Sequence, residues 1–92
     1  MRMTFASLVA PATLTAARVD PAIALDILWA AAYPADLIEH IHVRASSGRI
    51  DLVIYHLATD PTTAAQTLLD LCRRAQRGSP VLHGWSASVA SP

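Results

Sequence analysis

Hydrophobic and polar residues alternate along two neighbouring segments in the middle of the chain, Leu37–Ala45 and Arg49–Ala58. A period of two residues is typical of β-strands that bury one face. The residues between the segments contain Gly48, which suits a tight turn, and a two-residue turn pairs Ser46 with Arg49. The pattern therefore predicts a β-hairpin with this register.

The register gives the hairpin one wholly apolar face and one mixed face. Arg44 faces Asp51 on the mixed face, and Glu39 comes opposite His56 at the end of the apolar face. A slip of one residue would bring His and Asp side chains onto the apolar face, which favours the register above. The apolar face contains Ile41, Val43, Ala45, Ile50, Leu52 and Ile54.

Two Asp-Pro pairs, Asp20-Pro21 and Asp60-Pro61, predict the starts of two helices. The Asp side chain accepts from free backbone N–H groups, and Pro fits the first helical position. We expect helices over Pro21–Tyr33 and Pro61–Arg77. The second has one apolar stripe, which includes Cys72, whereas the first is apolar on nearly every side. The first helix therefore needs more burial than one small domain provides.

Two further segments, Thr13–Val19 and Val81–Ser88, are expected to be the first and last strands. The element order is then β-α-β-β-α-β, the split β-α-β arrangement of the ferredoxin-like α+β fold. It predicts a four-stranded antiparallel sheet with both helices on one face. We expect a single domain over residues 1–92, with 1–10 and 87–92 at its periphery.

The order of elements and two local motifs resemble the ACT domain, a small regulatory module. Val19-Asp20-Pro21-Ala22 resembles the loop that leads into the first helix of that family, with Ala22 in place of the family's glycine. Leu37-Ile38-Glu39, followed by alternating residues, resembles the start of its second strand. The resemblance implies a dimer that binds an amino acid or a related small molecule. Its ligand site would include Val19, Asp20, Pro21, Ala22, Leu37, Ile38 and Glu39.

Composition narrows the classes of partner. Apolar residues make up 53% of the chain and charged residues only 15%, so we expect apolar surface covered by a second copy, in a homodimer. The formal net charge is zero, which argues against nucleic acid. No apolar run is long enough to span a membrane. Residues 1–10 imitate a signal peptide only faintly, and the single cysteine fits the reducing cytoplasm.

The candidate chemistry lies on the face of the sheet away from the helices. His40 and His42 share that face, and the register puts them opposite Tyr55 and Val53. A His-x-His pair binds a metal only with further ligands, and none is evident, so we expect no metal and no cofactor. Glu39 beside His56 is expected to be a polar pair at the rim of the core. We expect no catalytic residues.

Three functions follow as hypotheses. The first is a small dimeric module that senses a ligand or regulates a larger enzyme. The second is a dimeric α+β-barrel enzyme, of the monooxygenase or cyclase type, in which His40, His42 and Tyr55 line a pocket between two open sheet faces. The third is a structural adaptor that docks on a larger protein through its first helix.

Overall fold

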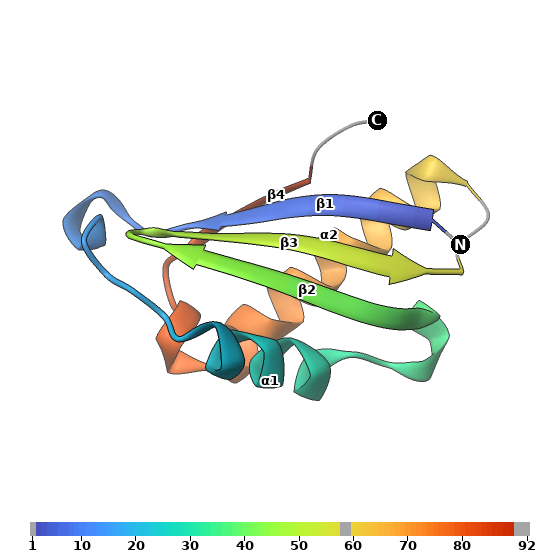
Figure 1. The fold of residues 1–92 in the computed structure, drawn as a ribbon, viewed down its shortest axis with the longest axis horizontal. Coiled ribbons are helices and arrows are strands. Elements are labelled where there is room, and N and C mark those ends of the chain that lie inside the picture. Colours follow the sequence, from blue (N-terminus) through green and yellow to red (C-terminus); the bar gives the residue numbers. More distant parts are fainter. Residues whose placement is uncertain (1, 58–59, 90–92) are drawn as a thin grey trace.

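The computed structural model describes residues 2–57 and 60–89. These residues form an antiparallel four-stranded sheet with two α-helices on one face and an α+β element order (Figure 1). The strands lie in the order β2-β3-β1-β4. Neither of these two helices lies on the other face of the sheet (Figure 1). The elements are β1 (Arg2–Val9), α1 (Pro21–Ala31), β2 (Ile38–Ser46), β3 (Arg49–His56), α2 (Pro61–Gly78) and β4 (Ser86–Val89), with short 3-10 turns at Ala12–Leu14, Pro34–Asp36 and Pro80–Leu82.

The first strand differs from the prediction. Thr13–Val19 is not a strand; β1 is Arg2–Val9, and it lies inside the sheet between β3 and β4. The hydropathy pattern does not reveal this strand, because both of its faces carry apolar side chains. Apolar and polar residues therefore do not alternate clearly along it. Residues 1–10 were expected at the periphery of the domain, and this prediction is wrong, since eight of them form a central strand.

The segment between β1 and α1 wraps around the tip of the β2–β3 hairpin instead. The amide of Ala10 donates to the carbonyl oxygen of Gly48 at 2.9 Å, and the amide of Gly48 donates to that of Ala17 at 2.7 Å. Gly48 has a positive φ of 67°, and a Cβ there would lie 2.6 Å from the carbonyl oxygen of Thr15. Glycine is therefore required both by the turn and by the close approach of this segment.

The hairpin register is confirmed from the turn onward. Ser46 pairs with Arg49, Arg44 with Asp51, and His40 with Tyr55. Beyond His40 an irregularity shifts the pairing, so that His56 lies opposite Ile38 and not opposite Glu39. The predicted Glu39–His56 pair is therefore wrong. A bulge inserts one residue into a strand, and alternation alone does not reveal it.

Both predicted helices are present. The carboxylate of Asp20 accepts from the amide of Ala22 at 2.8 Å, and that of Asp60 accepts from the amide of Thr63 at 2.9 Å, so both Asp side chains cap their helices as expected. The predicted stripe of α2 is buried against the sheet, with Cys72 fully enclosed. The last strand is shorter than predicted and starts at Ser86, because Pro80–Leu82 forms a 3-10 turn before it. Residues 87–89, which were expected at the periphery, pair with β1 in the sheet, and 90–92 lie outside the described residues.

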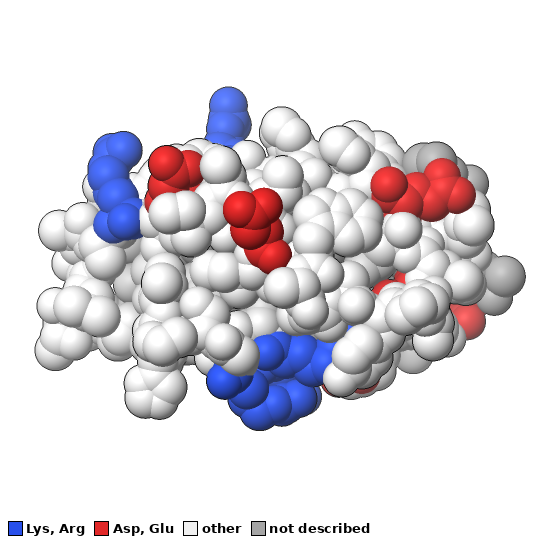
Figure 2. Space-filling model, turned by 90° about the horizontal axis from the view of Figure 1, so that it is seen from below, with Lys and Arg blue, Asp and Glu red and all other residues white. Residues whose placement is uncertain are grey.

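The core lies between the helices and one face of the sheet. Its fully buried side chains include Leu8, Leu28, Ile41, Ile50, Leu52, Ile54, Leu68 and Leu71. In contrast to α2, helix α1 buries only Ala24 and Leu28. The outer side of α1 leaves Ile23 and Trp29 about half exposed. Most of the face that carries α1 is uncharged, with acidic groups scattered over it and a basic cluster at its lower edge (Figure 2).

Candidate functional site

The open face of the sheet is built from the alternate residues of the strands whose other residues form the core. Three exposed apolar side chains come from β1: Met3 at 54% exposure, Phe5 at 50% and Val9 at 40%. Val53 and Tyr55 of β3 are half-buried beside them, since Phe5 pairs with Val53 and Met3 with Tyr55. One end of the two central strands therefore carries an apolar patch, which we call the open-face patch: Met3, Phe5, Val53 and Tyr55. Val9 lies apart from it, beyond Ser7 and opposite Arg49.

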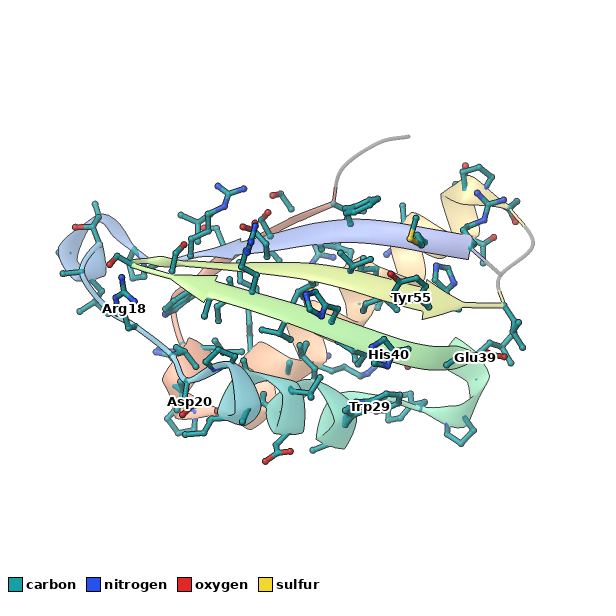
Figure 3. The ribbon with its side chains drawn as sticks, viewed as in Figure 1. Arg18, Asp20, Trp29, Glu39, His40 and Tyr55 are labelled. Carbon is teal, nitrogen blue, oxygen red and sulfur yellow. The ribbon has the colours of Figure 1, made fainter. Side chains whose placement is uncertain are left out.

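The two predicted histidines lie at the rim of this patch. His40 and His42 are exposed on β2, opposite Tyr55 and Val53 as predicted. The ring centroids of His40 and Tyr55 are 5.6 Å apart, with the planes tilted by 47° (Figure 3). The structure thus brings together all three open-face residues that the sequence singled out. Met3 and Phe5 lie on the same face. The sequence pattern did not reveal these two residues, because the first strand was expected at Thr13–Val19.

The other end of the open face is polar. Asp51 forms an ion pair with Arg49 at 2.9 Å and accepts a hydrogen bond from the Ser7 hydroxyl at 2.8 Å. The Ser7 hydrogen bond, followed by Arg49 and Arg44, lowers the pKa of Asp51 against the opposing effect of partial burial. Arg44 lies opposite Asp51 as predicted, although the close ion pair joins Asp51 to Arg49 on its own strand.

The two segments that resemble the ACT ligand site are not brought together in one chain. Asp20 lies at the start of α1, whereas Glu39 lies beyond its far end (Figure 3). In the first segment Val19 is buried, whereas Asp20, Pro21 and Ala22 are exposed. Helix α1 separates the two segments by about 16 Å along its axis.

The second segment has an unusual backbone. Leu37 has a left-handed conformation, with φ of 57°, and its side chain is 49% exposed. Its amide closes the 3-10 turn by donating to the carbonyl of Pro34 at 3.1 Å. Ile38 packs partly into the core, and Glu39 is exposed. The left-handed residue turns the chain from the helix layer into β2.

His56 belongs to the core and not to a catalytic pair. Its side chain is 2% exposed, and its Nε2 lies 2.7 Å from the Thr4 hydroxyl. Nδ1 has no hydrogen-bond partner among the described residues. Burial, and secondly the positive charge of Arg2, lowers the pKa of His56, so the ring is held neutral. This neutral imidazole contributes to packing.

A hollow of about 550 Å³ lies between the C-terminal ends of α1 and α2. One wall is Arg74, which donates to the carbonyl of Ala31 at 2.9 Å, forms an ion pair with Asp36 at 2.5 Å and stacks over the ring of Tyr33. These contacts of Arg74 join α2 to the end of α1 and to the turn that follows it. The lining residues are Ile27, Ala30, Ala31, Tyr33, Arg74, Ala75, Arg77, Gly78 and Ser79.

The single cysteine is a core residue, as predicted. Cys72 is fully buried, and burial raises the pKa of its thiol to about 11. A thiol with so high a pKa is almost wholly protonated at neutral pH and is a poor nucleophile. Trp85 is buried as well, whereas Trp29 is 42% exposed.

Two further features are absent from the residues that the structure describes. Among them, no three His, Cys, Asp or Glu side chains are placed so that one chain could hold a metal ion. Within the same residues, neither helix has the length and hydropathy needed to cross a bilayer. The chain matches no family model, no curated protein and no solved structure.

Proposed function

We propose that the chain is a ferredoxin-like regulatory module that works as a homodimer, joined through the open face of its sheet. The open-face patch carries this proposal, because Met3 and Phe5 are 54% and 50% exposed on a face where neither of the described helices lies. Contiguous exposed apolar groups of this kind mark interaction surfaces. The element order and the sheet order β2-β3-β1-β4 support the ferredoxin-like assignment.

The anatomy of the open face suits a protein interface. Its centre is apolar, and its rim is formed by His40, His42, Arg44 and the Arg49–Asp51 pair. Stable interfaces have this arrangement of an apolar centre and a polar rim. Packing two such faces against each other removes Met3 and Phe5 from water, which stabilises the dimer through the hydrophobic effect.

The size of the open face allows one contact at most. Eight residues per central strand span roughly 27 Å, three long strands are roughly 14 Å wide and β4 adds about half a strand, which gives roughly 450 Å² in flat projection. The accessible area of a corrugated face is larger than its projection. A standard interface buries about 800 Å² on each partner. Most of the open face would therefore be used by one such contact.

A second copy fits this face better than a polyanion does. The rim carries both signs of charge, with Asp51 paired to Arg49, and the whole chain has a formal net charge of zero. Binding to a phosphate backbone depends on an excess of basic groups. A self-complementary contact needs no such excess.

Light-scattering mass in solution tests the dimer. The wild-type chain is expected at twice its 9.8 kDa mass, and Phe5→Glu is expected at the monomer mass, because it buries a charge in each face. The control is Val81→Glu, at a residue 47% exposed on a 3-10 turn, which is expected to remain dimeric. A wild-type monomer, or a Phe5→Glu dimer, contradicts the proposed interface.

The ACT-like ligand site is a second candidate function. Its two segments, 19–22 and 37–39, lie at opposite ends of α1, so a ligand would contact both only where two chains meet. Titration calorimetry with the common amino acids tests this function. Heat that disappears in Asp20→Ala supports it, and the absence of heat with every amino acid removes the sensing role while leaving the dimer intact.

A further inference from the structure

The outer edge of β2 is open to a further strand. β2 is the last strand on its side of the sheet, and none of the described strands pairs with that edge. Ser46 and Arg49 flank a two-residue turn, so they exchange both backbone hydrogen bonds, and such pairs alternate along a hairpin. The backbone N–H and C=O groups of Ile41, Val43 and Ala45 therefore point away from β3, toward this edge.

Two imidazoles stand next to that edge. His40 and His42 are two residues apart, so they lie about 7 Å from each other on the open face, and both are exposed. Imidazole is the nitrogen ligand that zinc prefers, and a closed zinc site has four ligands in a tetrahedron. One chain supplies only half of that number here. Among the described residues, no third His, Cys, Asp or Glu of the same chain completes the set.

A second copy of the chain, related by a two-fold axis at the edge of β2, supplies the other two imidazole ligands. Ile41 carries outward-facing N–H and C=O groups, so it can form a hydrogen-bonded pair with the same residue of a second copy in an antiparallel arrangement. In that register His40 lies opposite His42 of the partner subunit, and His42 lies opposite His40 of the partner subunit. Directly opposed residues have Cβ atoms about 5 Å apart. All four imidazoles then lie on one face around one point.

We propose that a divalent transition-metal ion of the zinc type joins two copies of the chain edge to edge along β2, held by His40 and His42 of both copies. The site is incomplete in one chain and complete in two. Imidazoles at these spacings can turn their nitrogens inward to about 2 Å from a common ion. The ion in turn offsets the weakness of a short edge-to-edge strand pairing, because it binds the paired state only.

The surroundings of β2 are compatible with this contact. Helix α1 packs under β2, and its Trp29 is 42% exposed, so edge-to-edge pairing brings the two α1 helices near each other and covers apolar surface. Arg44, two residues beyond His42 on the same face of β2, carries a charge of the same sign as the metal. The electrostatic interaction of Arg44 with Asp51 partly offsets that charge.

The edge contact is separate from the proposed contact of the open faces, and the two are tested separately. In the Phe5→Glu variant, which is expected to be a monomer, addition of zinc chloride is expected to double the light-scattering mass. Removal of zinc with EDTA is expected to restore the monomer. Titration calorimetry is expected to give one zinc ion per two chains. These results do not depend on whether the open faces pair in the wild type.

The controls use the other histidine that is exposed. The double variant His40→Gln/His42→Gln in the same background is expected to keep its fold by circular dichroism and to lose the zinc-dependent mass change. His83→Gln, at an exposed residue outside β2, is expected to retain it. Zinc bound at one ion per chain without a mass change overturns the proposal. So does a mass change that survives in the double variant.

Discussion

The two faces of the sheet are made by the same strands and differ in what covers them. On β3, Ile50, Leu52 and Ile54 point toward the helices and are at most 2% exposed. On the adjacent strand β1, Met3 and Phe5 point the other way and are about half exposed. Both sets are apolar. Hydropathy therefore identifies the apolar residues of the strands. The placement of the helices decides which of these residues are buried within one chain.

The same contrast extends to the polar groups. The Arg74–Asp36 pair lies in the helix layer, with side-chain exposures of 15% and 10%, and has several partners. The Arg49–Asp51 pair lies on the open face, with exposures of 52% and 42%. On the face of the sheet that the helices cover, ion pairs such as Arg74–Asp36 stabilise the fold. The open face retains apolar and polar groups that are available to another chain.

The largest expected effect comes from truncating neighbouring residues that point to opposite faces. Leu52→Ala is expected to lower the free energy of unfolding by about 2–5 kcal/mol, because it leaves a cavity in the core. Val53→Ala, on the open face, is expected to cost under about 1 kcal/mol. Urea unfolding of both variants in the Phe5→Glu background measures a single chain. Equal losses contradict the difference between the faces.

The two ion pairs provide the second test. Arg74→Ala is expected to lower the free energy of unfolding by about 3 kcal/mol, because it leaves the Asp36 carboxylate nearly buried without its cation. Arg49→Ala is expected to cost about 0.5 kcal/mol, because an exposed pair is screened by water. The measurement is chemical denaturation of both variants at neutral pH in the Phe5→Glu background, where the open face is expected to be free. A loss from Arg49→Ala as large as that from Arg74→Ala contradicts the difference between the two ion pairs.

A smaller effect is expected from pH. The pKa of His56 is lowered from its ordinary value of 6.5, so the unfolded chain takes up a proton before the folded one. The stability that the neutral imidazole supports is present above pH 6.5 and is lost as pH falls below it. Urea midpoints at pH 8, 6 and 5 measure this loss. His56→Gln is expected to have a flatter profile over the same range, and an unchanged slope rules out His56 as its source.

The smallest effect concerns chemical access. Cys72 has a thiol pKa of about 11 and is buried, so a thiol reagent at pH 8 is expected to label it slowly in the folded protein and fully in urea. A cysteine introduced at Met3, in a Cys72→Ser background, is expected to react rapidly in the Phe5→Glu monomer. Rapid labelling of Cys72 in the native chain contradicts its burial.

The sequence by itself determined the elements that rest on local chemistry. Asp20 and Asp60 start the helices because their side chains satisfy the first amides, and Gly48 sets the hairpin register because it permits a tight turn. The placement of His40, His42 and Tyr55 on one face follows from that register. The buried stripe of α2 follows from its period.

Only the tertiary structure decided which segment is the central strand and which apolar residues remain exposed. β1 is identified by its partners β3 and β4, since its own side chains are apolar on both faces and carry no clear period. The bulge that separates Glu39 from His56 depends on the path from the helix layer into β2. The open-face patch exists because both helices pack on one side of the sheet and because β1 pairs with β3 and β4, strands far from it in sequence, which no local pattern encodes.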